Sequence, residues 1–151
     1  RTDLKKKIND GADRMTDVKR DIIIHCSATP EGKEFDVEDI RRWHKNRGWR
    51  DVGYHFVIKL DGTVQEGRSI KPFVNGAHTV GHNRSIGICY IGGVDEDMQP
   101  KDTRTPEQKR ALRELIYELK NDYPEATIYG HRNFAAKACP SFDAHMEYFD
   151  L

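Results

Sequence analysis

Two kinds of hydrophobic pattern alternate along the chain. Apolar runs over 21–26, 54–60 and 85–91 predict strands, and the first and last are continuous enough to be buried on both faces. Apolar residues spaced three and four apart predict amphipathic helices over 36–47 and from 105 onward. Because strands and helices intermix, the pattern favours an α/β class with a mixed sheet.

Turn and capping signals set several boundaries of these elements. Asp61-Gly62 predicts a hairpin turn before a returning strand at 63–66. Thr105-Pro106-Glu107-Gln108 combines an N-cap, a proline at the first helical position and a capping box. The other expected features are an N-cap at Asp36, a helix stop at Gly48, a short strand at 126–129 and a helical turn within 143–149.

Length and composition indicate a single folded domain. With 151 residues the chain can bury a substantial core, and we expect a polar appendage at 1–20 followed by the domain at 21–151. Lys plus Arg and Asp plus Glu are 25 each, so nothing points to nucleic acid as a partner. The longest apolar stretch, 86–91, is too short to span a membrane. We also expect the protein to be a monomer.

No export signal is visible in this sequence. Residues 1–20 contain Lys5-Lys6-Lys7 but no apolar segment of the kind that signal peptides carry. This pattern fits a protein released by cell lysis, and it fits equally a chain from which a leader has been removed.

Three residues far apart in sequence have settings that suit a metal ligand. His25 and His131 each follow a strand-like run, and Cys139 lies in a loop next to proline, where Lys137 would favour its thiolate form. The other two cysteines, Cys26 and Cys89, lie in apolar runs typical of core positions. Two imidazoles and one thiolate would leave a tetrahedral zinc ion with one open position, as in catalytic sites. The spacing alone is a weak signal, because a histidine near a strand also fits a hydrogen-bonded structural role.

Several motifs, in order, resemble the zinc-dependent N-acetylmuramoyl-L-alanine amidases. The likeness extends over about residues 21–142 and is strongest to the short bacteriophage amidases historically called lysozymes; animal peptidoglycan recognition proteins share the pattern. The motifs are Ile24-His25-Cys26-Ser27-Ala28-Thr29, Gly48-Trp49-Arg50-Asp51-Val52-Gly53-Tyr54-His55-Phe56, Asp61-Gly62-Thr63-Val64, Gly76-Ala77-His78, Asn83-Arg84-Ser85-Ile86-Gly87-Ile88 and Lys137-Ala138-Cys139-Pro140-Ser141-Phe142.

This resemblance implies a fold, a cofactor and a reaction. It implies a single domain whose central mixed sheet is flanked by helices, with zinc at the floor of a surface groove held by His25, His131 and Cys139. It assigns catalytic roles to Tyr54 and Lys137. The expected activity is hydrolysis of the amide between N-acetylmuramic acid and L-alanine in peptidoglycan. The alternatives are a module that binds muropeptides without cleaving them and, more distantly, a zinc hydrolase of another amide; non-catalytic relatives typically lack the cysteine ligand that this chain retains.

Three further residues are candidates for substrate contact. Trp49 and Arg50 could line a groove for sugar or peptide. His78, in the Gly-Ala-His stretch, is compatible with contacting substrate, neighbouring the metal or capping a loop. His55 follows Tyr54 directly, so the two side chains should point to opposite faces of the strand.

Overall fold

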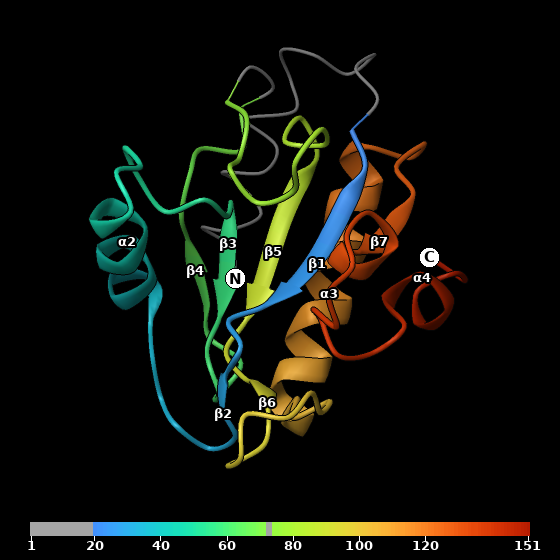
Figure 1. Ribbon diagram of the computed structural model, residues 1–151. Helices are drawn as coiled ribbons and strands as arrows, with labels where there is room; N and C mark the ends of the chain where they lie inside the picture. The colour runs from blue at the N-terminus through green and yellow to red at the C-terminus, as the bar shows by residue number, and fades with distance from the viewer. Residues whose placement is uncertain (1–19, 72–73) are drawn as a thin grey trace.

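The computed structural model describes residues 20–71 and 74–151 of the chain. Within them a five-stranded sheet has the order β4-β3-β5-β1-β7 (Figure 1). β4 is antiparallel to β3, and every other neighbouring pair is parallel, so the predicted mixed sheet is confirmed. The strands are β1 (Ile22–Cys26), β3 (Phe56–Ile58), β4 (Val64–Glu66), β5 (Ile86–Tyr90) and β7 (Ile128–Gly130).

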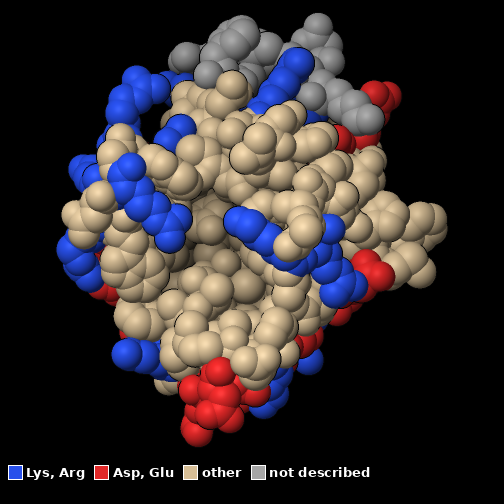
Figure 2. Space-filling view, viewed as in Figure 1, with Lys and Arg blue, Asp and Glu red and all other residues tan. Residues whose placement is uncertain are grey.

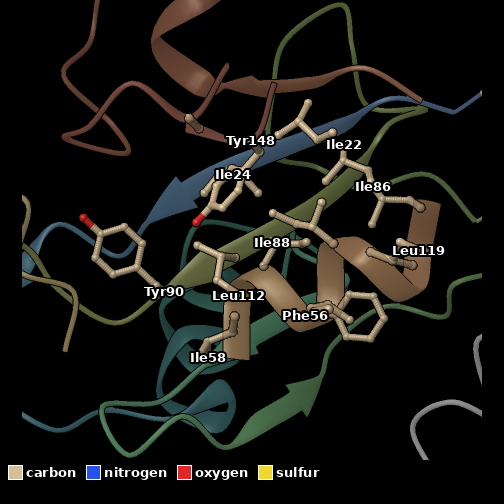
Figure 3. Packing of buried hydrophobic residues seen from close by; sticks show 14 of the residues in the cluster. Ile22, Ile24, Phe56, Ile58, Ile86, Ile88, Tyr90, Leu112, Leu119 and Tyr148 are labelled. Carbon is tan, nitrogen blue, oxygen red and sulfur yellow. The ribbon is translucent and has the colours of Figure 1, made fainter. Parts of the chain in front are cut away.

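Helices cover both faces of this sheet. α2 (Val37–Asn46) and α3 (Pro106–Asp122) lie on different sides, and α4 (Ala144–Glu147) lies next to β7 (Figure 1). The α3 side holds the larger apolar cluster, in which side chains of β1 and β5 meet Leu112 and Leu119 (Figure 3). The α2 side holds a smaller cluster that includes Val57 of β3 and Cys89 of β5.

The side chain of His25 faces the α2 side of the sheet. It pairs in register with Cys89, whereas its neighbour Ile24 belongs to the cluster on the α3 side. The smaller cluster contains residues of α2, β3 and β5 but no residue of β1 or β7. The apolar packing beneath α2 therefore does not extend over the His25 side of β1, and Figure 2 shows a hollow on this face of the molecule with Lys and Arg on both of its sides.

Local signals placed the helix boundaries correctly. The side chain of Asp36 accepts from the Asp39 amide, and Thr105 forms the expected capping box with Gln108. Gly48 has φ +90°, the left-handed conformation that favours glycine directly after a helix. The terminal helical turn is α4, with Asp143 as its N-cap.

Very short elements were not predicted. β2 (Thr29–Pro30) pairs with β6 (Gly93–Val94) in a second, two-stranded parallel sheet. A 3₁₀ turn, η1 (His131–Asn133), follows β7 directly. Two or three residues are too few to create a hydrophobic period, so only the tertiary structure reveals them.

The predicted appendage at 1–20 falls almost wholly outside the described residues. The exception is Arg20, whose guanidinium is buried beside the sheet. It donates hydrogen bonds to the carbonyls of Ile70, Lys71, Val74 and Arg84. Among the described residues, no helix has both the length and the apolar character needed to cross a membrane.

Candidate metal centre

The pairing of β1 with β7 brings two histidines together. Ile24 and Gly130 are partners in this parallel pair, so the next residues along the two strands, His25 and His131, are neighbours. Their ring centroids are 4.6 Å apart. Because β1 and β7 are parallel, their carboxyl ends lie at the same edge of the sheet, and each places one imidazole there, as the sequence pattern predicted.

The loop after η1 brings Cys139 to the same place. The backbone N–H of Cys26 donates to Cys139 Sγ at 3.2 Å, and the Arg132 N–H donates to the Cys139 carbonyl at 2.8 Å. These bonds fix the sulfur 3.9 Å from Nδ1 of His25. The third candidate ligand is therefore held by β1 on one side and by η1 on the other.

The three side chains fit a tetrahedral metal ion. One donor atom from each of His25, His131 and Cys139 lies within 4.8 Å of the other two, and the described residues contain no other group of this kind. Two donors on a tetrahedral zinc are roughly 3.3–3.6 Å apart, so small side-chain shifts would bring all three into coordination. The soft thiolate and the imidazoles form a donor set that suits zinc. This group could therefore hold a metal.

The surroundings keep His25 neutral and Cys139 protonated when no cation is near. Burial, together with the charges of His78, His131 and Lys137, lowers the pKa of His25 well below its ordinary value. A hydrogen bond with the Cys26 thiol and burial raise the pKa of Cys139. The sequence suggested that Lys137 would favour the thiolate, but these two effects are stronger. A cation bound beside the sulfur would act in the opposite direction and favour the thiolate.

His131 and Lys137 lie on the open side of the cluster. His131 is half-buried and Lys137 is exposed. Burial and the positive charge of Lys137 both lower the pKa of His131. Because that charge acts on both histidines, the ammonium lies close enough to influence a group bound beside the three ligands.

Tyr54 packs directly against His25. Its ring centroid is 5.0 Å from that of His25. Burial and the neighbouring thiols of Cys89 and Cys139 raise the pKa of Tyr54 well above its ordinary value. The phenol therefore remains protonated at neutral pH and can donate a hydrogen bond.

His78 neighbours a candidate ligand instead of lying at the surface. It is buried, and its Nδ1 is 2.9 Å from Nε2 of His25. Its own Nε2 is 3.0 Å from the Ser85 carbonyl. The sequence left three interpretations of His78 open, and the one in which it neighbours the metal cluster agrees best with this placement.

Trp49 is linked to the cluster only through other rings. Trp49 is 36% exposed, and its ring packs 4.4 Å from that of His44, which in turn lies 5.6 Å from Tyr54. This row of rings connects the exposed indole to the site. Arg50 is exposed. A substrate role for both residues stays a prediction.

Sequence reasoning missed several residues that support the site. Cys26 appeared to be ordinary core, yet its amide and thiol both contact Cys139. Thr79 was not singled out, although its hydroxyl is 3.2 Å from Nε2 of His25. The position of Cys26 next to His25 was a usable signal, whereas nothing local marks Thr79. His55 is directed away from Tyr54 into the interior, where its Nδ1 accepts from the Gly87 amide.

Comparison with known proteins identifies the family. The sequence profile described as N-acetylmuramoyl-L-alanine amidase matches residues 15–142. The chain belongs to the N-acetylmuramoyl-L-alanine amidase family. It is 47% identical to the endolysin of Enterobacteria phage K11 over 121 residues, which cover 80% of this chain and 79% of the relative.

Solved structures agree with the assignment. The amidase LysC from Clostridium intestinale superposes with a TM-score of 0.69 at 30% identity, covering 85% of this chain and 80% of the other. Drosophila PGRP-LB gives a TM-score of 0.69 at 28% identity, covering 85% and 78%. The present chain is thus an amidase that hydrolyses peptidoglycan, and the likeness found in its motifs is confirmed.

Proposed function

We propose that this amidase depends on zinc held by His25, His131 and Cys139, and that it cleaves the amide between N-acetylmuramic acid and L-alanine. The observation that carries the proposal is the convergence of the three donor atoms within 4.8 Å at the end of β1. Zinc bound there would supply a positive charge that polarises the scissile carbonyl and acidifies water. Three protein ligands leave the fourth position open for chemistry.

Lys137 and Tyr54 supply the groups that this reaction needs beside the metal. Attack of water on the amide carbonyl places negative charge on its oxygen, and the exposed ammonium of Lys137 stabilises that charge. Tyr54, whose raised pKa keeps its hydroxyl protonated, donates a hydrogen bond to the water or to the same oxygen. Cleavage of the C–N bond, with a proton from the attacking water passing to the nitrogen, then releases the stem peptide with L-alanine as its free N-terminus.

Substrate contacts extend the same proposal. We place the glycan or peptide in the hollow of Figure 2, whose sides carry Lys and Arg. Trp49 offers an exposed aromatic face to sugar C–H groups, and Arg50 offers a cation to the carboxylates of a stem peptide. The relatives named endolysins support action on the cell wall. Release at lysis and a monomeric state remain predictions.

A digest of purified peptidoglycan tests the function. The protein is incubated with peptidoglycan in three states: as prepared, treated with chelator, and treated with chelator and then resupplied with zinc. New amino termini are labelled and identified by mass spectrometry. We expect new N-terminal L-alanine that disappears with chelator and returns with zinc.

The controls separate cleavage from binding. His145→Ala removes an imidazole that bonds the Ile128 carbonyl instead of facing the metal cluster, and it should retain activity. Cys139→Ala should abolish both zinc retention and product. If zinc-loaded protein releases no L-alanine termini but still pulls down with peptidoglycan, the chain is a muropeptide-binding module. Full activity in metal-free protein would reject the zinc mechanism.

A further inference from the structure

The ring of His78 occupies a space that two glycines leave open. A Cβ on Gly76 would lie 2.3 Å from Cδ2 of His78, and a Cβ on Gly87 would lie 2.6 Å from the same atom. Both distances are far shorter than van der Waals contact between carbon atoms. Glycine at both positions is therefore required for the ring to lie where it does.

The backbone on either side of this ring is also fixed. The Asn83 side-chain oxygen accepts from the His78 amide at 2.7 Å and from the Thr79 amide at 2.8 Å. One side chain thus holds two successive amides of the loop. The position of the imidazole is consequently set by its backbone as well as by its neighbours.

The hydrogen bonds of His78 determine which of its nitrogens carries the proton. The Ser85 carbonyl can only accept, so Nε2 of His78 must be the donor across their 3.0 Å contact. A neutral imidazole has one N–H, which leaves Nδ1 of His78 with a lone pair. That lone pair faces Nε2 of His25 at 2.9 Å.

The same logic then applies to His25. Since Nδ1 of His78 accepts, Nε2 of His25 must carry the hydrogen, and Nδ1 of a neutral His25 is left unprotonated. This Nδ1 is the atom that lies 3.9 Å from Cys139 Sγ. The nitrogen with the free lone pair is thus the one directed at the other candidate ligands.

We propose that His78 is a positioning residue that holds His25 in the tautomer and orientation required for metal binding through Nδ1. It does so through His25 and does not itself bind the metal or the substrate. The proposal rests on the metal site proposed above. Hydrogen bonds to the distal nitrogen of a histidine ligand generally fix its ring and increase its basicity.

Thr79 shares this contact and provides a control. Its hydroxyl is 2.8 Å from Nδ1 of His78 and 3.2 Å from Nε2 of His25. It can accept part of the His25 N–H, but the longer distance makes it the weaker partner. Thr79→Val, which keeps the shape and removes the hydroxyl, should change zinc affinity less than loss of the His78 acceptor does.

The first experiment measures the tautomer of His25 in zinc-free wild-type protein. Long-range proton–nitrogen NMR spectra of histidine-labelled protein distinguish Nδ1–H from Nε2–H rings. We expect His25 and His78 both in the Nε2–H form. An Nδ1–H form of His25 would overturn the proposal, and this result requires no variant to fold.

The second experiment compares two variants, each of which replaces one of the two imidazole nitrogens with a side-chain amide group. His78→Asn places an oxygen near the position of Nδ1, whereas His78→Gln places an amide nitrogen near Nε2 and lacks the acceptor for His25. Zinc dissociation constants are measured by competition with a chromogenic chelator. We expect a loss of about 10–100-fold in His78→Gln, and a much smaller loss in His78→Asn. Thermal unfolding in chelator confirms that each variant is folded.

The outcomes separate this proposal from the proposed function. Wild-type zinc affinity in His78→Gln, or equal losses in the two folded variants, would show that His78 only fills space. If the wild-type protein binds no zinc, the proposed metal mechanism fails, yet the NMR spectra still show whether His78 sets the His25 tautomer.

Discussion

The hydroxyl of Tyr90 donates a 2.6 Å hydrogen bond to the carbonyl of Pro140, the residue after Cys139. Tyr90 is the last residue of β5 and is fully buried, so this bond anchors the ligand loop to the centre of the sheet. In Tyr90→Phe the carbonyl loses its partner in a buried setting. We expect the free energy of unfolding to fall by about 1–3 kcal/mol and zinc affinity to fall as well, measured by chemical denaturation and chelator competition.

A second buried tyrosine gives the matched control. The Tyr148 hydroxyl accepts from the Arg104 guanidinium at 2.9 Å, beside α4 and not in the ligand loop. Tyr148→Phe should therefore lower stability by a similar amount without changing zinc affinity. If both variants weaken zinc binding equally, the Tyr90 bond has no specific effect on Cys139.

Removal of a proposed ligand should abolish metal binding without unfolding the sheet. His131 is only half-buried, and His131→Ala leaves the core intact. We expect zinc affinity to drop by more than about 100-fold. This loss is larger than that usually caused by mutating a residue that only hydrogen-bonds to a ligand. Metal content after dialysis, measured by atomic absorption, checks this. Near-stoichiometric zinc in purified His131→Ala would contradict the proposed ligand set.

Tyr54 and Lys137 should affect turnover and leave the metal in place. Neither belongs to the three-residue donor group, although both lie beside it. Loss of a hydrogen-bond donor or a positive charge at the reacting carbonyl costs on the order of 10²-fold in kcat. Tyr54→Phe and Lys137→Ala should show this loss in a peptidoglycan hydrolysis assay while retaining one zinc per chain. Loss of zinc in either would instead indicate a structural role.

Stability should decrease as the pH falls below about 6.5, and His55 is one cause. Its Nδ1 accepts from the Gly87 amide and its Nε2 donates to the Val74 carbonyl, so only the neutral ring satisfies both partners. Burial lowers the pKa of His55 to about 3. Below the ordinary histidine pKa of about 6.5, the unfolded chain binds a proton that the folded chain does not. Folding stability is then lost as the pH drops.

The size of this effect can be measured against a variant. Between about pH 6.5 and pH 5 one such histidine contributes a loss of roughly 1.6 kcal/mol. Denaturation in chelator at several pH values should show a smaller decrease over this interval in His55→Asn, whose side-chain oxygen can still accept from the Gly87 amide. Identical decreases in both proteins would mean that His55 titrates normally in the folded state.

Sequence patterns predicted the main elements because each carries a local signal. The capping box at Thr105 and the helix stop at Gly48 depend only on neighbouring residues, and both were correct. Each of His25 and His131 lies at the end of a predicted strand, which suggested that they meet, and the β1–β7 register confirms this. The chemistry assigned to these residues required the family likeness as well.

The contacts of the supporting residues could not be predicted, because they are long-range and no local signal specifies them. The contacts of His78 with His25 and of Cys26 with Cys139 join segments 53 and 113 residues apart. No local period records such a contact. The burial of Arg20 is a further example, since its partners are backbone carbonyls, which any residue could supply.

The order of the strands in the chain has a consequence for biosynthesis. His25 and Cys139 are 114 residues apart, and β7, which places His131, follows α3 in sequence. A chain synthesised only as far as α3 contains most of the sheet but a single candidate ligand. The reactive centre therefore assembles late, after the strand at the edge of the sheet has joined β1. Metal bound across these segments would then act as a cross-link that closes a loop of most of the protein.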